Sequence, residues 1–229
     1  MERFVTTSDG SPTLYSARFG QSYHSLHGAL TESRRVYLEL GFAYVAEQQT
    51  VLHVLEMGFG TGLNALLTWI EAEKRGLQVQ YTALEAYPIG PEDVAVLNSN
   101  PVLESDRFLA LHEAAWGKEI QLSAGFSLQK IATTLEEFCD GGVPIREVDL
   151  IYFDAFGPRT QPELWTPEVF AALANVLRSG GVLTTYSSKG SVRRALKQAG
   201  FVVEKHRGPP GKLEIVRAIF TPNLMRIES

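Results

Sequence analysis

Apolar runs and stretches of helical periodicity alternate along this chain. The clearest unit is an apolar run over residues 51–57, followed by a glycine-dense turn and a helical pattern from Leu63 to Lys74. Further apolar runs lie at residues 78–86 and 149–154, and a helical pattern covers residues 167–177. Strands that alternate with helices in this way predict an α/β domain with a mostly parallel sheet.

The last part of the chain follows a different pattern. A strand is predicted over residues 182–187, after Gly180-Gly181, and an amphipathic helix over residues 189–199. Two more strands are predicted over residues 201–206 and 214–221, joined by a glycine- and proline-rich loop. This order predicts an antiparallel hairpin that closes the sheet. A NAD-binding Rossmann fold is expected to end in a further parallel strand, so the hairpin favours another nucleotide fold.

Residues 101–147 are the least regular part of the chain. One strand is predicted over residues 120–127 and one helix over residues 131–138, with Gly141-Gly142 ending the helix. With this strand, the predicted sheet has seven strands. No catalytic residue is predicted in this region.

The N-terminal part precedes the first long apolar run. Two short strands around an Asp-Gly turn are predicted over residues 4–19, then a polar segment over residues 20–28 and a helix from Ala29 to about Gly41. We therefore expect two parts, a hairpin and helix extension of residues 1–45 and a Rossmann-like domain of residues 46–229.

The polar segment and the helix after it carry several hydrogen-bonding side chains. Tyr23, His24 and His27 lie in the segment, and Glu32 lies on the predicted helix. Such a segment could cap a ligand pocket. The two histidines are three residues apart with no third candidate ligand nearby, so we expect no metal site.

The composition is that of a globular domain. The chain has 229 residues, with 45% hydrophobic and 21% charged residues. No segment approaches the roughly 18 uncharged apolar residues that a membrane span requires. The first residues lack the apolar stretch of a secretory signal, and the single cysteine, Cys139, cannot form an internal disulfide. We therefore expect a cytoplasmic protein that does not associate with a membrane.

The charge is unevenly distributed. The formal net charge is −5, but residues 178–229 hold ten Lys or Arg residues against three acidic ones, which makes this part +7 and the remainder −12. A basic C-terminal third on an acidic body can present a positive surface to nucleic acid. Solvated helix and hairpin faces would give the same pattern, so the charge alone leaves both interpretations open.

The glycine-dense turn carries the most specific local signal. A dinucleotide-binding loop has glycines at the first, third and sixth positions. Here they fall at Gly58, Gly60 and Gly62, and Leu63 stands where the third glycine is expected. The spacing that begins at Glu56 instead resembles the first motif of Rossmann-like class I S-adenosylmethionine-dependent methyltransferases, whose cofactor has no pyrophosphate.

Two carboxylates are expected near this turn. Glu85 ends the second strand, 23 residues beyond Gly62, close to the spacing at which such folds place an acid against ribose hydroxyls. Asp154 follows the strand over residues 149–154, and ligands of open α/β sheets bind outside the carboxyl ends of the strands. A solvent-facing Glu85 and an Asp154 that caps the following turn are the alternatives.

Several stretches together resemble the methyltransferase part of the MnmC family, bifunctional enzymes that complete 5-methylaminomethyl-2-thiouridine at the tRNA wobble position. The resemblance covers nearly the whole chain, and its most specific part is an Asp-x-Phe-x-Pro stretch that continues to Trp-Thr-Pro-Glu. The matching stretches are Tyr23 to Tyr37 with Gly28 and Glu32, Glu56 to Asn64, Glu85 to Pro88, Phe153 to Pro158, Pro162 to Phe170, and Gly190 to Phe201.

The resemblance implies a cofactor site for S-adenosyl-L-methionine. It implies that the cofactor lies over residues 58–64 and Glu85, that residues 23–32 close on it, and that the acceptor lies near Asp154. The cofactor-binding residues expected on this basis are Tyr23, Glu32, Glu56, Gly58, Gly60, Gly62, Asn64 and Glu85.

The resemblance also implies a reaction. The primary amine of 5-aminomethyl-(2-thio)uridine in tRNA would receive the methyl group, and Asp154 would accept a hydrogen bond from that amine as the catalytic residue. No metal is implied. The residues expected to contact the substrate or RNA are Phe156, Lys189, Arg193, Arg194, Lys205, Arg207 and Lys212.

Three departures from the family pattern accompany the resemblance. The flavin-dependent oxidase part is absent, so we expect an upstream tRNA-modifying enzyme to supply the aminomethyl group. The Gly-Asp pair expected to contact adenine is missing between Phe126 and Leu135, and the basic pair near the last hairpin is reduced to Lys212-Leu213. A small-molecule amine or another RNA base as acceptor, and a catalytically silent RNA-binding protein, remain alternatives.

Overall fold

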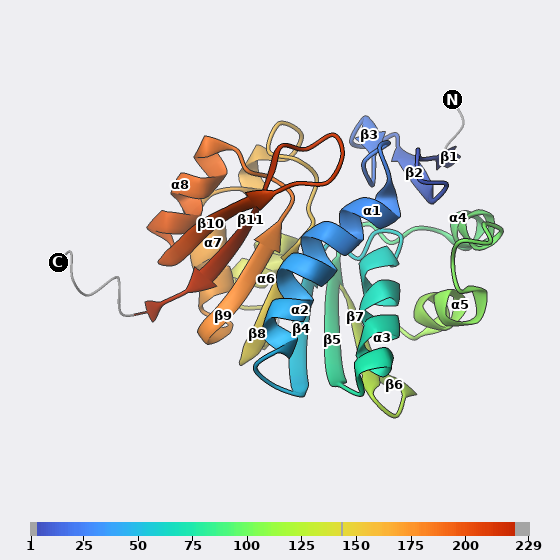
Figure 1. The fold of residues 1–229 in the computed structure, drawn as a ribbon, viewed down its shortest axis with the longest axis horizontal. Helices are drawn as coiled ribbons and strands as arrows, with labels where there is room; N and C mark the ends of the chain where they lie inside the picture. The colour runs from blue at the N-terminus through green and yellow to red at the C-terminus, as the bar shows by residue number, and fades with distance from the viewer. Residues whose placement is uncertain (1–3, 143, 223–229) are drawn as a thin grey trace.

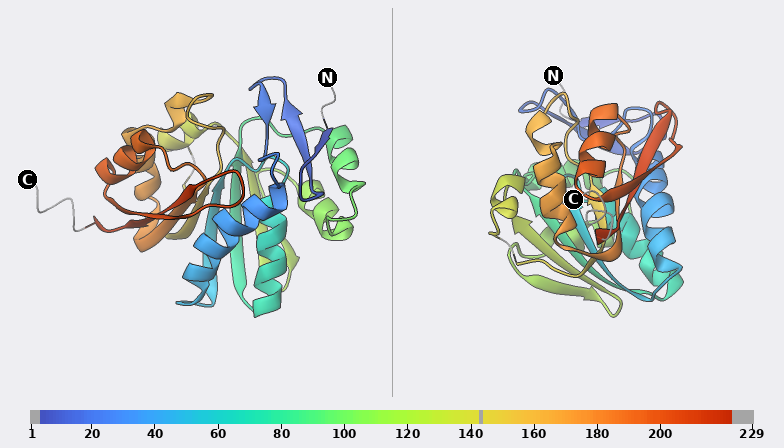
Figure 2. Two further views of the ribbon diagram at one scale, coloured as in Figure 1. Left: turned by 45° about the horizontal axis from the view of Figure 1, so that its top comes forward. Right: turned by 90° about the vertical axis from the view of Figure 1, so that its left-hand side faces the viewer.

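A central sheet with helices on both faces organises the computed structural model, which describes residues 4–142 and 144–222 (Figures 1 and 2). Among these residues the sheet has eight strands in the order β10-β11-β9-β8-β4-β5-β7-β6. The strands are β4 (Val51–Met57), β5 (Gln78–Glu85), β6 (Glu119–Ser123), β7 (Phe126–Ala132), β8 (Val148–Phe153), β9 (Leu177–Thr185), β10 (Phe201–Arg207) and β11 (Glu214–Phe220).

The middle of the sheet is parallel, as the strand and helix alternation predicts. Strand β4 pairs in parallel with both β5 and β8, and β5 and β8 continue in parallel to β7 and β9. The carboxyl ends of β4, β5 and β8 therefore meet at one edge of the sheet. The glycine turn, Glu85 and Asp154 follow these ends directly, so all three lie at this edge.

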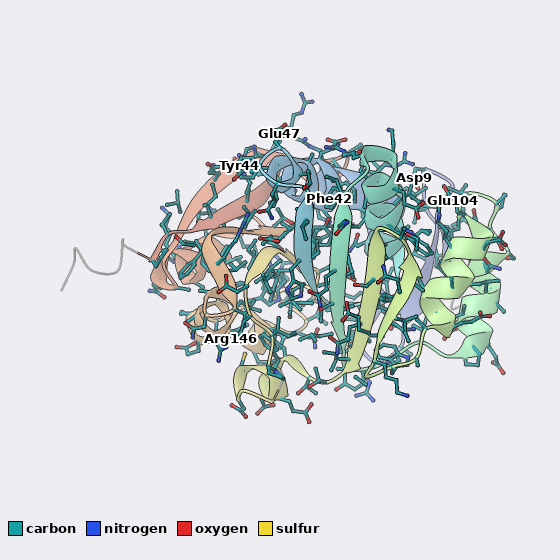
Figure 3. The ribbon with its side chains drawn as sticks, turned by 90° about the horizontal axis from the view of Figure 1, so that it is seen from below. Asp9, Phe42, Tyr44, Glu47, Glu104 and Arg146 are labelled. Carbon is teal, nitrogen blue, oxygen red and sulfur yellow. The ribbon has the colours of Figure 1, made fainter. Side chains whose placement is uncertain are left out.

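The sheet separates two hydrophobic cores because side chains alternate along each buried strand. Leu52 and Val54 of β4 pack into one core, with the helices drawn in blue and cyan in Figure 1. Leu55 and Met57 of the same strand point into the other core, on the opposite face. Phe42, labelled in Figure 3, is fully buried in the first core, where its helix meets the sheet.

Helices cover both faces of this sheet. In the part of the chain that the structure describes, none is long and apolar enough to cross a bilayer. The helices that follow β4 are α3 (Leu63–Arg75), α4 (Pro91–Asn98), α5 (Ser105–Glu113), α6 (Leu135–Cys139), the 3-10 turn η2 (Pro162–Leu164), α7 (Pro167–Ala174) and α8 (Gly190–Gln198).

The C-terminal hairpin is confirmed. Strands β10 and β11 pair antiparallel from Phe201 with Phe220 to Arg207 with Glu214, and β11 also pairs antiparallel with β9. Strand β9 begins at Leu177, earlier than predicted, because Gly180-Gly181 lie inside the strand at an irregular register with β8 instead of preceding it.

The strand count differs from the prediction by one. The single strand predicted over residues 120–127 is a hairpin of β6 and β7 with a turn at Ala124-Gly125. A side chain at Gly125 would place its Cβ 2.8 Å from the Leu77 carbonyl oxygen, so this turn requires glycine. The sheet therefore has the seven predicted strands and one additional edge strand, β6.

The helix predicted over residues 131–138 is wrong at its start. Strand β7 continues to Ala132, and helix α6 begins at Leu135. Thr134 sets this boundary, because its side chain accepts from the Glu137 N–H while the Glu137 carboxylate accepts from the Thr134 N–H. Helix α5, residues 105–113, was not predicted.

The N-terminal strands and a long helix cover the carboxyl edge and one face of the sheet. Strands β1 (Phe4–Thr6), β2 (Pro12–Ser16) and β3 (Gln21–Ser22) form a separate small sheet, as predicted for the first two. The helix is longer than predicted and consists of α1 (Ala29–Ser33), the π-helical η1 (Arg34–Phe42) and α2 (Ala43–Ala46). Gly41 lets it approach the sheet, since a Cβ there would lie 3.0 Å from Thr184.

Candidate active site

A cleft of about 280 Å³ opens at the carboxyl edge of the central strands. In Figure 1 this edge lies at the top, beside the N-terminal strands and the loop between β10 and β11. Three groups of residues meet in the cleft: the glycine turn, the ends of β5 and β8, and the N-terminal polar segment. Its lining includes Tyr23, Glu32, Gly58, Gly60, Asn64, Glu85, Asp154, Phe156, Tyr186 and Lys212.

The glycine turn has a backbone that only glycine adopts easily. Gly58, Gly60 and Gly62 all have positive φ angles, of 94°, 52° and 74°. A Cβ at Gly58 would lie 3.1 Å from the Asp154 carbonyl oxygen, and one at Gly60 would lie 3.1 Å from the Tyr23 ring. The three glycines therefore let the turn pass between the end of β8 and the N-terminal segment.

Glu85 fastens this turn to the end of β5. Its Oε2 accepts from the Gly60 N–H at 2.8 Å, and its Oε1 accepts from the Tyr87 N–H at 2.8 Å. Burial raises the pKa of the Glu85 carboxyl, and the backbone N–H donors oppose the rise. Each carboxylate oxygen can accept a second hydrogen bond, so the group retains the capacity expected for holding ribose hydroxyls.

Asn64 joins two carboxylates at the start of α3. Its Nδ2 donates to Glu56 Oε1 at 2.9 Å and to Asp154 Oδ2 at 2.8 Å, and its Oδ1 is buried without a partner among the described residues. Glu56 is fully buried, and burial raises the pKa of its carboxyl well above the usual value. Glu56 therefore supports Asn64 from below, and Asn64 orients Asp154.

Asp154 is held from two sides at the end of β8. Tyr37 from helix η1 donates its O–H to Asp154 Oδ1 at 2.6 Å, and Asn64 occupies the other oxygen. Burial raises the pKa of Asp154 to about 7, with Glu32 adding to the rise and the hydrogen bonds from Tyr37 and Asn64 opposing it. The carboxyl can therefore exchange a proton near neutral pH.

The N-terminal segment forms one wall of the cleft. The Tyr23 ring lies against Gly60, and His24 lies between Thr13 Oγ1 at 3.0 Å and Thr61 Oγ1 at 3.4 Å. Burial lowers the pKa of His24 to about 4, so its ring is neutral at physiological pH. No group of three or more potential metal ligands is found in residues 4–142 and 144–222.

Glu32, predicted to bind the cofactor, lines the cleft as part of this wall. Its Oε2 accepts from the Ser25 N–H at 3.0 Å, and its Oε1 pairs with Lys212 from the loop between β10 and β11. The side chain lies toward Asp154 and Tyr186, which both respond to its charge. In this structure Glu32 therefore belongs to the Asp154 side of the cleft.

Aromatic rings line the mouth of the cleft. Phe156 lies 4.3 Å from Phe19 and 5.3 Å from Tyr23, measured between ring centroids. Trp165 fixes the segment that carries Phe156, because its Nε1 donates to the Phe156 carbonyl oxygen at 2.9 Å. The Trp-Thr-Pro-Glu stretch thus positions an aromatic surface beside Asp154.

The predicted basic residues divide into two groups. Lys212 lines the cleft, whereas the other five lie on or next to α8 and β10 and are not among the described residues of the cleft lining. Two of the five have partners, since Lys205 pairs with Glu214 at 2.7 Å and Arg193 donates to the Ser188 carbonyl oxygen at 3.2 Å. The exposed ones are Lys189, Arg194, Lys205 and Arg207, and Arg193 is half-buried.

The sequence did not point to Tyr37, Tyr186 or Lys130. Tyr186 lines the cleft at the end of β9, and the buried Tyr37 contacts Asp154 from helix η1; neither has a local motif around it. Lys130 is buried beneath the glycine turn, where its ammonium donates to the His112 carbonyl oxygen at 2.8 Å and faces the rings of Phe59 and Trp116. A lysine in the alternating pattern of β7 is the one signal that could have marked it.

The charge of the cleft distinguishes between possible cofactors. Three carboxylates, Glu32, Glu85 and Asp154, line it against a single ammonium, Lys212, among the described residues. Such a lining repels a pyrophosphate and suits a sulfonium cofactor with a positive centre. The glycine turn and the donors and acceptors around it therefore fit S-adenosyl-L-methionine and do not fit a dinucleotide.

Comparison with known proteins agrees with this fold and with this cofactor. A family described as S-adenosyl-L-methionine-dependent methyltransferase matches residues 116–221. Over these residues the chain is similar to such methyltransferases, and its cofactor is S-adenosyl-L-methionine. A spermidine synthase structure with the transition state analogue AdoDATO, with a TM-score of 0.54 and 16% identity over 98% of this chain and 79% of that one, shares the fold alone.

More similar relatives define the group within this class. The tRNA 5-methylaminomethyl-2-thiouridine biosynthesis bifunctional protein MnmC of Paracidovorax citrulli is 34% identical over 93% of this chain and 34% of its own length. The protein of the same name from Polaromonas naphthalenivorans is 34% identical over 94% of this chain and 35% of its own length. The crystal structure of MNMC2 from Aquifex aeolicus has a TM-score of 0.77 and 26% identity, and covers 99% of this chain and 75% of that one.

The chain is thus similar over nearly all of its length to the MnmC proteins and to MNMC2. It spans about a third of the length of the curated relatives it matches. The resemblance described from the sequence motifs is therefore confirmed for the family and the fold.

Proposed function

We propose that this protein transfers a methyl group to the primary amine of 5-aminomethyl-(2-thio)uridine at the tRNA wobble position, forming 5-methylaminomethyl-(2-thio)uridine. The observation that carries the proposal is Asp154, a carboxylate fixed by Tyr37 and Asn64 at the mouth of a cofactor cleft. The similarity to MnmC proteins, whose name refers to this nucleoside, supports the choice of acceptor.

Residues around the glycine turn would hold the cofactor. Glu85 is available to the ribose hydroxyls, and residues 58–64 with Tyr23 would enclose the methionine part. When bound, S-adenosyl-L-methionine supplies an electrophilic methyl group. Glu56 acts indirectly, because it orients Asn64 from below the cleft.

Asp154 would orient and deprotonate the acceptor. An alkyl ammonium has no lone pair, so the amine must lose a proton before it can attack a methyl group. The pKa of Asp154, raised to about 7, makes its carboxylate a base of suitable strength near neutral pH. Because Tyr37 and Asn64 hold both oxygens, the carboxylate stays in one orientation as the amine approaches.

The RNA would be gripped outside the cleft. Phe156 and its neighbouring rings offer a stacking surface for an unpaired base, as aromatic side chains do in single-stranded RNA recognition. Lys189, Arg194 and Arg207 are exposed and suited to phosphate contacts. The basic C-terminal third that suggested this role includes residues 223–229, which lie outside the described residues.

Three further proposals accompany this function. An upstream tRNA-modifying enzyme would supply the aminomethyl group on tRNA, and the protein would act in the cytoplasm, where its tRNA is available. We also propose that residues 1–45 serve as a wall of the cleft for the domain of residues 46–229, since Tyr37 and Glu32 both reach into the site.

A labelled-methyl assay tests the proposed function directly. The protein is incubated with methyl-labelled S-adenosyl-L-methionine and with tRNA that carries 5-aminomethyl-2-thiouridine, and the tRNA is then digested to nucleosides. We expect label only in 5-methylaminomethyl-2-thiouridine. Label in another nucleoside, or in a small amine and not in tRNA, would refute the acceptor, and failure to bind the cofactor in calorimetry would identify a catalytically silent protein.

A further inference from the structure

Lys212 lies inside the cleft although sequence patterning places it among the phosphate-binding residues. It belongs to the loop between β10 and β11, and its ammonium pairs with Glu32, 180 positions away in the sequence. The same ammonium lies 4.6 Å from the centroid of the Tyr186 ring. Only 25% of the Lys212 side chain is exposed, and only 10% of that of Glu32.

The loop that carries Lys212 is fixed against the N-terminal wall. Gly211 has a φ of 83°, and a Cβ there would lie 2.2 Å from the His27 ring, so the loop packs directly on this histidine. The Arg207 carbonyl oxygen at the other end of the loop accepts from Arg35 Nε at 3.1 Å. Lys212 is therefore directed into the cleft by contacts on both sides of it.

The positive charge of Lys212 sets it apart from the other charged residues of the cleft lining. It is the one Lys or Arg among the described residues that line the cleft, and it faces the carboxylates Glu32 and Asp154. The charge of Lys212 lowers the pKa of Asp154, against the larger effect of burial. The ammonium thus acts on the group proposed to receive the acceptor.

The proposed acceptor amine is protonated in water at neutral pH, and a nearby cation would favour its neutral form. A primary alkyl ammonium has a pKa of roughly 10 in water, so well under one per cent is a neutral nucleophile at pH 7. Neighbouring carboxylates stabilise the ammonium and raise that pKa further. A second fixed ammonium in the cleft has the opposite effect, because like charges disfavour the protonated form.

We propose that Lys212, held in place by Glu32, lowers the pKa of the acceptor amine bound beside Asp154 and so keeps it in the neutral, nucleophilic form. This inference rests on the proposed methylation of an amine. The acceptor ammonium gives one proton to the Asp154 carboxylate, which leaves a lone pair on nitrogen. A nitrogen–carbon bond then forms as the sulfur–carbon bond breaks, the electron pair of that bond stays on sulfur, and the product is a secondary ammonium.

The other titratable groups around Lys212 do not take over this role. Burial keeps His24 neutral, with a pKa of about 4, and raises the pKa values of Tyr37 and Tyr186. These groups come from the N-terminal segment, helix η1 and the end of β9. The His27 ring packs on Gly211 of the same loop, and Lys130, with a pKa lowered by burial to about 8, lies beneath the glycine turn. Asp154, whose pKa is raised to about 7, is the group that would face the acceptor amine in the field of Glu32 and Lys212.

The pH dependence of a single turnover tests the inference. Saturating enzyme and S-adenosyl-L-methionine are mixed with aminomethyl tRNA between pH 6 and 9, and the methylation rate is measured for the wild type and for Lys212→Met. Under saturation the acidic limb reports groups in the complex. For Lys212→Met we expect the acidic limb of the rate profile to move to higher pH by about one unit. The methylation rate at pH 7 should then fall about tenfold, which is the effect of losing one nearby positive charge.

Matched variants separate this effect from a general loss of charge. Lys212→Arg should keep the limb within about 0.3 pH units of the wild type, because the cation remains. Lys74→Met removes an exposed lysine of α3, paired with Glu71 at 3.9 Å outside the cleft, and should leave the limb unchanged. Glu32→Gln serves if Lys212→Met does not fold, because it keeps the ammonium and removes the opposing carboxylate. The limb should then move to lower pH, and an unchanged or raised limb would contradict the inference.

Two outcomes would overturn the inference. In the first, Lys212→Met keeps the wild-type acidic limb, but the slope of log tRNA affinity against log salt is reduced by about 0.9. That result would make Lys212 a phosphate contact. If the limb and the salt slope both stay unchanged, the ion pair is structural. Failure of the wild type to methylate aminomethyl tRNA would instead refute the proposed function, so the two failures are distinguishable.

Discussion

The proposed cofactor side and the proposed acceptor side of the cleft are assembled in different ways. The cofactor side comes mainly from consecutive residues, Glu56 to Asn64, with Glu85 fastening the turn. The acceptor side brings together Tyr37, Asp154 and Lys212, and each comes from a different element. A site for an invariant cofactor can be encoded in one turn, whereas the position of the acceptor depends on packing between distant segments.

The electrostatics of the two sides also differ. On the cofactor side, Glu85 is satisfied by backbone N–H groups of the glycine turn and its neighbour. On the acceptor side, Asp154 accepts hydrogen bonds from the side chains of Tyr37 and Asn64, and burial raises its pKa to about 7. We therefore expect mutations on the first side to change cofactor affinity, and mutations on the second side to change rate and pH dependence.

The largest expected effect is that of Asp154→Asn. The amide keeps the shape of the side chain but cannot accept a proton, so the methylation rate should fall by about 10²–10⁴-fold. Affinity for S-adenosyl-L-methionine, measured by calorimetry, should change less than about threefold, because Asp154 belongs to the acceptor side. Full activity with unchanged cofactor affinity would show that Asp154 is not the catalytic residue.

Glu85→Ala tests the cofactor side. The Gly60 N–H loses its acceptor and the ribose hydroxyls lose a carboxylate, so the Kd for S-adenosyl-L-methionine should rise by roughly 10–100-fold. Glu92→Ala, which removes an exposed acid from α4, is the matched control and should bind normally. Normal binding by Glu85→Ala would mean that the turn holds the cofactor without this carboxylate.

Tyr37→Phe tests how the acceptor side is held. The phenol donates to Asp154 and lowers the pKa of that carboxyl, so its removal should raise the pKa further. The acidic limb of kcat/KM should then move to higher pH by about 0.5–1 unit, and the rate at pH 7 should fall several-fold, roughly threefold to tenfold. An unchanged limb would separate Tyr37 from the chemistry.

The smallest expected effect concerns the surface outside the cleft. Arg194→Ala on α8 should reduce the slope of log affinity for tRNA against log salt by about 0.9, with single-turnover chemistry at saturation unchanged. Arg75→Ala, which removes an arginine paired with Glu71 on α3, should leave the slope as it is. Equal slopes for both variants would place the RNA on another face.

Most elements of the fold could be predicted from local pattern. The alternation of Leu52 and Val54 with Leu55 and Met57 reflects a strand buried on both faces, and it appears in the sequence as a mostly apolar run. The hairpin β6–β7 was predicted as one strand, and helix α5 was not predicted. Helix α5 buries only Phe108 and Leu111, one turn apart, which is too short a repeat to predict a helix. In the hairpin, a two-residue turn separates two short strands that look continuous.

The sequence by itself determined the cofactor turn, the carboxylates at the strand ends and the terminal hairpin. Each of these depends on sterics or burial within a few consecutive residues, as in the positive φ angles of Gly58, Gly60 and Gly62. Only the tertiary structure decided that Tyr37 holds Asp154 and that Lys212 points into the cleft. Those contacts span 117 and 180 positions for the Tyr37–Asp154 and Lys212–Glu32 pairs, and they form because a helix and a loop pack over the same sheet edge.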